Sequence, residues 1–238
     1  DFGTLTPRDF GCFSGALACG PLCQTPSAEI CRSVVALTSG GSHSCVLLDD
    51  GTVWCWGNNA DGELGDGTTT NRRTPTPVTG LGETLAISAG YYHTCAVAVD
   101  RTARCWGDNY YGQLGNNSTT DSLVPVTIPG LAGVVSISAG LYHTCAVLED
   151  GTARCWGANA NGRLGDGTTT NRLSPVSVTG LTGVTGISAG ADSSCARLGD
   201  GSARCWGNNN FGQLGDGTIT ARTSPVAVSG LTDATLVV

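Results

Sequence analysis

Apolar and polar residues alternate along the chain in a strand-like pattern that recurs every fifty residues. An apolar run such as "VVALTSG" (34–40) precedes a hairpin with two cysteines, a Gly/Asn-rich loop and a Pro-flanked stretch such as "SPVSVTG" (174–180). Short runs bounded by turn residues are typical of β-strands. Because no stretch has helical periodicity, the pattern predicts an all-β protein with about four short strands in each unit.

The cysteines mark this repeat most clearly. The segment "CVLLDDGTVWCWG", which begins at Cys45, returns in related form from Cys95, Cys145 and Cys195. Four antiparallel strands in a fifty-residue repeat are the layout of a propeller blade. We predict a β-propeller of about four blades, with a Cys-rich N-terminal segment at 1–32 and an extra C-terminal strand at 233–238. The four propeller repeats are predicted at 33–82, 83–132, 133–182 and 183–232.

The repeats also carry sequence landmarks of a known family. The stretch "SAGLYHTCAVLEDGTARCWGANANGRLGDGTTTNRLSPVSV" has Gly-x-x-His-Thr, Asp-Gly, Trp-Gly-x-Asn, Gly-x-Leu-Gly and Pro-x-x-Val elements. Over 33–238 the chain resembles the regulator of chromosome condensation repeat family, in a bacterial-type secreted, disulfide-containing variant. The resemblance implies a β-propeller, usually with seven repeats per ring. Whether four blades close alone or through a second chain is left open.

Each hairpin is predicted to place its two cysteines opposite each other. Cys45 and Cys55 face each other only if the turn is centred on Asp50, as in a three-residue loop at 49–51. Their register position is one where Cα atoms lie about 4.5 Å apart, within disulfide range. Glycine suits the third loop position, and Arg101 is the exception. The predicted disulfides are Cys45–Cys55, Cys95–Cys105, Cys145–Cys155 and Cys195–Cys205.

The remaining cysteines form a separate group. They are Cys12, Cys19, Cys23 and Cys31, expected to pair among themselves in one of three arrangements. Buried free thiols are the alternative for the repeat cysteines, and zinc is disfavoured because close C-x₂₋₄-C spacing is missing there. Twelve cysteines favour an oxidising compartment. We therefore expect an extracellular or cell-surface location and, because the chain begins at Asp1 with no visible signal peptide, a mature secreted chain.

Charge excludes several function classes. The net charge is −7 and all twelve basic residues are arginine, which argues against nucleic-acid partners and removes a P-loop or Schiff-base lysine. No apolar run is long enough for a membrane-spanning helix. No Ser–His–Asp set, paired carboxylates or phosphate loop emerges, so we expect a non-enzymatic protein without cofactors.

Histidine recurs at one repeat position, as His43, His93 and His143, with Ser193 in the fourth unit. Three such residues could converge on a metal. Against this, no carboxylate recurs beside them as an orienting partner, and the resemblance implies that His-Thr satisfies backbone groups within its own blade. We predict no metal site.

Three further patterns have a structural and a functional interpretation. Trp106, Trp156 and Trp206 each follow an arginine by two residues, so stacking of indole on guanidinium is expected in three blades. The plant ultraviolet-B photoreceptor, a relative by this resemblance, uses stacked Trp and Arg for light sensing, but packing is the favoured interpretation here. "DGTTTNR" (66–72, 166–172) lacks the alternating ligands of a calcium loop. Asn116 and Asn117 are glycan acceptors only if the source organism glycosylates such sites.

The strand count suggests how the protein works. Four blades contain sixteen strands, and the C-terminal "ATLVV" is a seventeenth, which could pair with an uncharged sheet edge on another molecule, head to tail. The predicted assembly residues are Ala234, Thr235, Leu236, Val237, Val238, Val34, Val35 and Leu37. We expect an extracellular structural or adhesive subunit that self-assembles, forming a filament or a ring.

The main alternative is a secreted protein-binding or inhibitor module that acts as a monomer, because propellers of the resembled family, including a β-lactamase inhibitor protein, bind protein partners through loop surfaces. The partner is thus the chain itself or an extracellular protein. Guanine-nucleotide exchange, known for the founding nuclear member, is disfavoured by the cysteines, the short array and the acidic charge.

We predict that alkylating reagents leave the eight repeat cysteines unmodified in the unfolded, unreduced protein, because disulfide sulfur does not react as a thiolate. Peptide mass mapping before and after reduction measures this. Alkylation of these cysteines without reductant would show free thiols instead.

Overall fold

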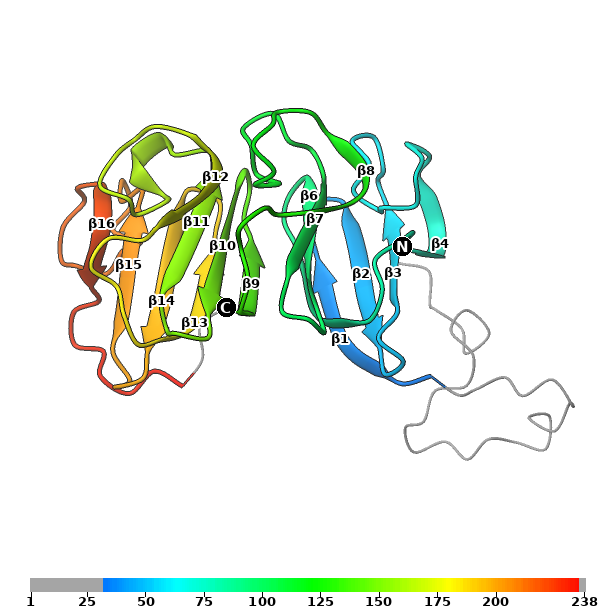
Figure 1. Cartoon of the computed structure of the whole chain (residues 1–238). Coiled ribbons are helices and arrows are strands. Elements are labelled where there is room, and N and C mark those ends of the chain that lie inside the picture. The colour runs from blue at the N-terminus through cyan, green and yellow to red at the C-terminus, as the bar shows by residue number, and fades with distance from the viewer. Residues whose placement is uncertain (1–31, 236–238) are drawn as a thin grey trace, which may run out of the picture.

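The computed structural model describes residues 32–235, and the first four cysteines lie outside this range. It confirms the all-β class: four sheets of four antiparallel strands, each in chain order, form four blades (Figure 1). The first blade contains β1 (Val34–Ser39), β2 (His43–Leu48), β3 (Val53–Gly57) and β4 (Arg72–Pro77). The second contains β5 (Thr84–Ala89), β6 (His93–Ala98), β7 (Ala103–Gly107) and β8 (Ser122–Thr127). The third contains β9 (Val134–Ala139), β10 (His143–Leu148), β11 (Ala153–Gly157), the short 3₁₀ helix η2 (Ala160–Gly162) and β12 (Arg172–Ser177). The fourth contains β13 (Val184–Ala189), β14 (Ser193–Leu198), β15 (Ala203–Gly207) and β16 (Arg222–Ala227).

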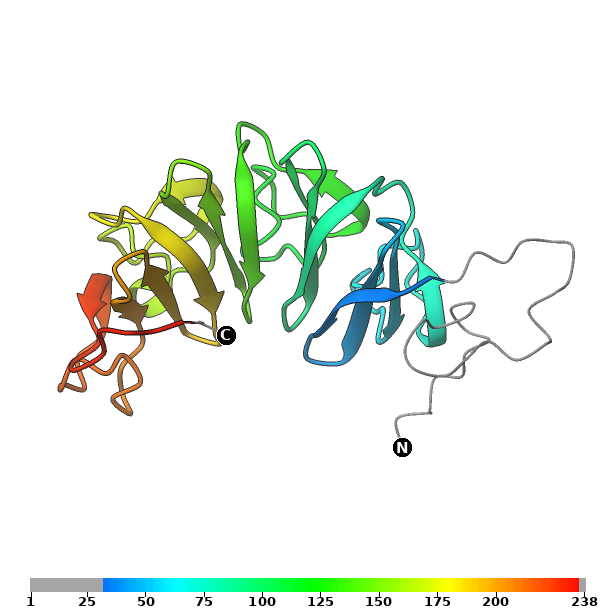
Figure 2. The same ribbon diagram turned by 90° about the horizontal axis from the view of Figure 1, so that it is seen from below.

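The blades stand side by side in an open arc, with the first and fourth at its two ends (Figure 2). The first strands β1, β5, β9 and β13 contact one another in succession. They therefore line the inner side of the arc, where a complete propeller has its axis. The four blades do not close a ring by themselves.

The hairpin loops explain the register of the cysteines. In the first blade Leu48 donates its N–H to the carbonyl of Thr52 (2.9 Å), and Gly51 takes a left-handed φ of 76°. Arg101 adopts the same conformation, with φ 63°, although glycine suits it better. The centred loop sets Cys45 opposite Cys55, with 4.1 Å between their Cα atoms. All four repeat disulfides are present in the structure and join the cysteine pairs that the spacing indicates.

The hydrophobic core lies between blades. Trp106 of the second blade is fully buried in a cluster with Cys45, Leu47 and Leu64 of the first. Trp156 and Trp206 are buried in the same way against the second and third blades. In the first three blades the disulfide-bearing face therefore packs against the tryptophan of the next blade, so a blade reaches its full burial only when a neighbour follows it.

The last strand of a blade begins earlier than the proline pattern suggests. In the third blade β12 starts at Arg172, before the predicted stretch at 174–180, because Arg172 already pairs with Gly157 across a register shift. Asp166 also binds the Arg172 guanidinium at 2.8 Å. The side chain thereby holds the strand's first residue against the preceding loop.

The close packing at each junction makes a matched pair of glycine substitutions informative. A Cβ added at Gly165 would lie 2.8 Å from the Trp206 Nε1 atom, whereas at Gly215 it would meet only Val228. Both glycines have φ near 70° and a valine neighbour at about 3 Å, so the backbone cost cancels in the comparison. We predict that Gly165→Ala lowers the free energy of unfolding by about 1–3 kcal/mol more than Gly215→Ala, because it overpacks a filled junction. Urea denaturation in dilute solution measures the difference, and equal losses would show that Trp206 does not occupy that position.

Candidate functional site

Each junction between blades is organised around one buried backbone carbonyl. The carbonyl of Gln113 in the second blade accepts hydrogen bonds from the Thr144 hydroxyl and the Trp156 indole N–H of the third, both at 2.8 Å. The equivalent carbonyls belong to Glu63, bound by Thr94 and Trp106, and Arg163, bound by Ser194 and Trp206. We call these three groups the junction carbonyls. Because both acceptor positions of each are used, the next blade satisfies a group that would otherwise be costly to bury.

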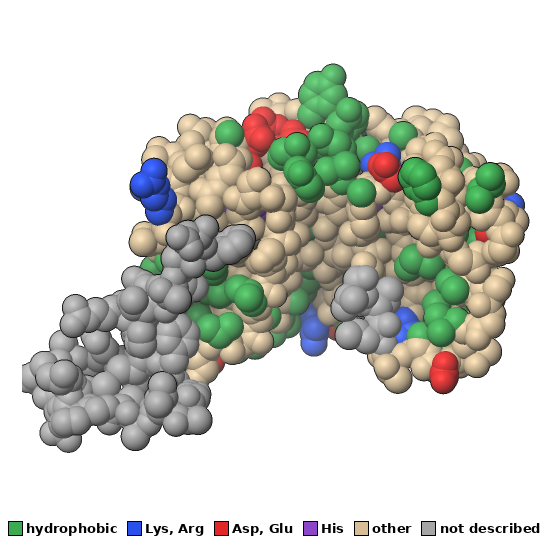
Figure 3. All heavy atoms as spheres, turned by 180° about the vertical axis from the view of Figure 1, so that it is seen from behind, with side chains coloured by type: hydrophobic (Ala, Val, Ile, Leu, Met, Phe, Trp, Pro, Cys, Tyr) green, Lys and Arg blue, Asp and Glu red, His purple; other side chains and the backbone are tan. Residues whose placement is uncertain are grey.

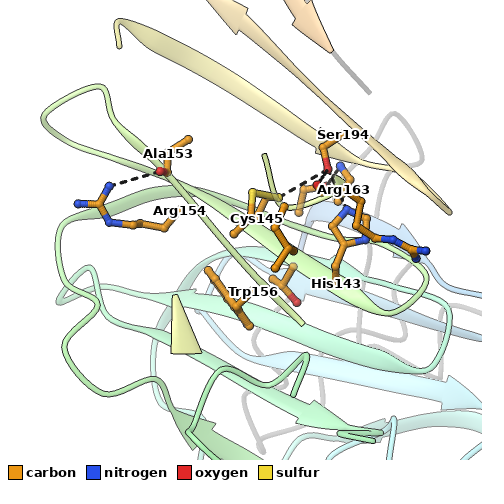
Figure 4. The surroundings of a disulfide bond; sticks show 12 residues. His143, Cys145, Ala153, Arg154, Trp156, Arg163 and Ser194 are labelled. Atoms are coloured by element: carbon orange, nitrogen blue, oxygen red, sulfur yellow. Dashed lines mark hydrogen bonds between the residues drawn. A yellow bond between two sulfur atoms is a disulfide. The ribbon is translucent and has the colours of Figure 1, made fainter. Parts of the chain in front are cut away.

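The recurring histidine completes the junction from the other side. His143 Nε2 lies 2.8 Å from the Ser194 hydroxyl, and His93 and His43 bind Thr144 and Thr94 in the same way. The expectation that histidine serves its own blade is therefore wrong: it bonds across to the next one. Figure 4 shows His143, Ser194 and Arg163 around the disulfide of Cys145.

The direction of these bonds fixes the histidine protonation. Since the Thr144 hydroxyl donates its proton to the Gln113 carbonyl, His93 Nε2 must carry the proton and donate to the hydroxyl oxygen. Burial lowers the pKa of His93 and of His143 to about 3, and that of His43 to about 4. All three histidines are thus neutral at pH 7. Within residues 32–235 no group of three His, Cys, Asp or Glu side chains could hold a metal ion.

The expected stacking of arginine on tryptophan is not found among the described residues. Arg104 donates instead to the carbonyls of Gly80 (3.0 Å) and Leu81 (2.8 Å). Arg154 reaches the carbonyl of Ala153 (Figure 4). The indole is enclosed by the preceding blade, so the guanidinium binds carbonyl groups near the surface rather than the ring.

The loops considered as calcium sites have internal partners. Asp66 Oδ1 accepts the Thr68 hydroxyl (2.7 Å), and its Oδ2 binds the Arg72 guanidinium (2.8 Å). Burial raises the pKa of Asp66, but the hydrogen bonds from Thr68 and Arg72 outweigh it and lower the pKa overall. The carboxylate therefore closes its own loop. In the second repeat, Asn117 is exposed and Asn116 partly so, and their glycosylation stays a prediction.

The fourth blade has no blade packed on its outer side, and this side is hollow. A cavity of about 250 Å³ is lined mainly by apolar groups. We define the open face as Arg197, Ala203, Gln213, Leu214, Val228 and Leu231. Leu231 is 39% exposed, whereas its equivalents Leu81, Leu131 and Leu181 are 4–5% exposed. Gln213 is exposed, while Glu63, Gln113 and Arg163 are buried. The open face thus corresponds to the receiving side of the other junctions and has no blade upon it.

The open face also departs from the other three junctions at two positions. Ser193 replaces the histidine, so the bond to a following blade cannot form in the same way. Arg197 stands where Leu47, Val97 and Val147 are buried. Sequence reasoning missed Arg197, although its charge at an apolar repeat position could have revealed it.

In the first strand of the first blade, a position that is buried in the other three blades is exposed. Val34 is 42% exposed, whereas its equivalents Thr84, Val134 and Val184 are buried against preceding blades. Val35 and Leu37 are exposed as well. The predicted assembly residues of this strand therefore lie at the surface in the described part of the chain.

The predicted extra strand lies only partly within the described residues. Leu236, Val237 and Val238 fall outside, and Asp233, Ala234 and Thr235 have no strand pairing. The Ala234 N–H nevertheless donates to the Gly201 carbonyl at 2.9 Å, as Thr84 does to Gly51 and Val184 to Gly151. At Ala234 the chain thus makes the hydrogen bond that, in the other repeats, lies at the start of the first strand of the next blade.

This fold and its junctions define a β-propeller protein built from blade repeats. The sequence of residues 13–238 matches the RCC1-like domain family, and the chain belongs to that family.

Solved structures of similar fold include human WBSCR16, with a TM-score of 0.77 at 24% identity, covering 85% of this chain and 58% of that one. Yeast RCC1 (Prp20), in a complex with Kap60, has a TM-score of 0.74 at 24% identity and covers 83% and 49%. At these identities they show the fold alone. The chain spans about half the length of these structures.

Curated relatives match over shorter stretches. Human E3 ubiquitin-protein ligase HERC2 is 40% identical over 50 residues, which are 21% of this chain and 1% of HERC2. Ultraviolet-B receptor UVR8 of Arabidopsis thaliana is 40% identical over 50 residues, 21% of this chain and 11% of the receptor. The chain therefore covers only a small part of either protein. Within residues 32–235 no helix has the length and apolar character to cross a membrane.

The buried histidines predict how stability depends on pH. Their pKa in the folded chain is below the unfolded value of about 6.5, so their stabilisation is complete above pH 6.5 and is lost as the pH falls towards 3–4. We expect His93→Gln, which keeps a donor but cannot titrate, to reduce the slope of unfolding free energy between pH 6 and 4 by up to about 1.4 kcal/mol per pH unit. Urea titrations at several pH values measure both slopes. Equal slopes would show that His93 is protonated in the folded protein.

Proposed function

We propose that this chain is a non-enzymatic structural propeller subunit, which self-associates head to tail by seating the first blade of one copy on the open face of the next. The observation that carries the proposal is that the apolar lining of a receiving junction, including Leu214, Val228 and Leu231, is present on the fourth blade without a blade on it. Apolar surface left uncovered at such a junction is stabilised by any partner that removes it from water.

The first and fourth blades each carry a residue that departs from the repeat, and these two residues, Trp54 and Arg197, are complementary. At the junction between the first two blades, Arg104 reaches the carbonyl of Leu81, the equivalent of Leu231. The same arginine entering the open face would meet Arg197, which lines that cavity together with Leu231. The first blade carries Trp54 at this position. An indole next to Arg197 replaces repulsion between like charges with a favourable cation–π contact.

The C-terminal residues contribute to the same contact. The Ala234 N–H makes the hydrogen bond that Thr84 and Val184 make at the start of a first strand. We propose that 234–238 adds to the first blade of the partner copy, beside or in place of its exposed β1, where Val34, Val35 and Leu37 lie. Because the donating and receiving surfaces differ, the contact is head-to-tail and produces a ring if it closes and a filament if it does not.

We place this function outside the cell or at its surface. Four disulfides in 24.1 kDa are consistent with an oxidising compartment. With only 13% charged residues, the surface offers few ion-pair networks, so cross-links and blade packing supply the stability that a subunit outside the cell requires.

Sedimentation velocity over a range of protein concentrations tests the proposal. We predict concentration-dependent assembly of the native chain, strong weakening by Leu231→Asp, which buries a charge in the contact, and weakening by deletion of 234–238. Ile219→Asp is the matched control, because Ile219 is an exposed apolar residue that does not line the cavity.

A monodisperse monomer at all concentrations would contradict self-association and favour the secreted binding module. Equal effects of Leu231→Asp and Ile219→Asp would show that assembly does not use the open face. Thermal melts of each variant ensure that only folded proteins are compared.

A further inference from the structure

All five tyrosines of the chain lie together on one rim of the second and third blades. Tyr91 and Tyr92 precede β6, Tyr110 and Tyr111 follow β7, and Tyr142 precedes β10. Their rings form a continuous series with centroid distances of 4.7 Å for 91–92, 5.4 Å for 92–142, 5.0 Å for 142–111 and 4.8 Å for 111–110. Figure 3 shows hydrophobic-coloured side chains gathered beside acidic ones along the upper edge of the molecule.

These rings surround a hollow that also contains carboxylates from two blades. The hollow has a volume of about 280 Å³ and we call it the tyrosine cup. It is lined by Asp61, Tyr92, Asp108, Tyr110, Tyr111 and Tyr142. Asp61 comes from the first blade, Asp108 from the second and Tyr142 from the third. The cup therefore exists only when three blades are packed together.

The negative charge in the cup is poorly compensated. Burial raises the pKa of Asp61, and the nearby carboxylates of Glu63 and Asp121 raise it further. The Asp61 carboxylate has no hydrogen bond or ion pair with the described part of the chain. Asp108 accepts a hydrogen bond from Gln113 at 2.6 Å, but burial and the charges of Asp121 and Asp61 raise its pKa as well.

This combination of groups selects one ligand chemistry. A cation over the faces of several aromatic rings is attracted by their quadrupoles, and nearby carboxylates add direct Coulomb attraction. Anions such as phosphate are repelled. A bare divalent metal ion requires several oxygen ligands, and the described lining of the cup offers only two carboxylates, those of Asp61 and Asp108. The cup therefore suits an organic cation, either an alkylammonium or a guanidinium group.

The rim of the cup indicates how the cation is presented. Tyr110 is 72% exposed and Tyr91 is 48% exposed, so the aromatic surface extends beyond what a small free cation covers. Exposed tyrosines of this kind are enriched at protein interfaces, where they provide contact area at low entropic cost. We propose that the tyrosine cup binds a basic side chain, lysine or arginine, presented by a partner protein.

Titration of short capped peptides into the native chain tests this proposal. The probes are Gly-Arg-Gly, Gly-Lys-Gly and the neutral, similarly shaped Gly-norleucine-Gly, with tetramethylammonium as a free cation. We predict that the basic peptides shift the NMR signals of the cup tyrosines and the neutral peptide does not. Tyr111→Ala and Asp61→Asn should each weaken the binding of the basic peptides about three- to tenfold.

Asp49→Asn is the matched control for charge, because Asp49 lies in an exposed hairpin loop of the first blade and its substitution changes the net charge equally. Equal losses from Asp61→Asn and Asp49→Asn would overturn the proposal, as would equal binding of the norleucine peptide. Binding of tetramethylammonium without binding of either basic peptide would also overturn it. Because the cup and the open face share no lining residue, the peptide titration tests the cup separately from self-association.

Discussion

The arrangement of this protein depends on a backbone carbonyl that each blade leaves for its neighbour to satisfy. The carbonyls of Glu63, Gln113 and Arg163 are buried, and each receives one hydroxyl and one indole N–H from the following blade. An unpaired carbonyl at such a site would cost about 1–3 kcal/mol. The packing of two blades therefore both satisfies the carbonyl and buries the large tryptophan. A single blade can do neither.

This dependence gives the chain a direction. At each of the three junctions the earlier blade receives its neighbour on the side that carries its disulfide, and the later blade inserts the side that carries its tryptophan. The stability of such an array is a sum of blade terms and nearest-neighbour terms, so its ends are its weakest points. Here the fourth blade ends with its receiving side uncovered. The proposed self-association removes this weakness by covering the open face with the first blade of another copy. The tyrosine cup, in contrast, uses the assembled arc as a platform, since three blades contribute to it.

Local patterns made much of this structure predictable from the sequence. The hairpin disulfides follow from a spacing of ten residues and a three-residue turn, both of which act within a few residues of Cys45 and Cys55. The four blades follow from the fifty-residue period, because each unit repeats the same local strand and turn pattern.

Contacts between residues of neighbouring repeats could not be predicted from local patterns. His43 lies 51 residues from Thr94, its partner, and only the packing of two blades brings them together. The stacking predicted for Arg104 failed because carbonyls of the preceding blade competed for its guanidinium. The tyrosines were missed because their meeting depends on the angle between blades.

Hydrogen exchange of the indole N–H groups tests most directly whether packing between blades holds the junctions together. It is followed by NMR in the native, ¹⁵N-labelled chain. The Trp106, Trp156 and Trp206 indoles donate to junction carbonyls and are fully buried, whereas Trp54 donates to the exposed Thr52 hydroxyl. The account predicts that the first three protons exchange orders of magnitude more slowly than that of Trp54, because exchange requires two blades to separate. Exchange of all four at similar rates would contradict it.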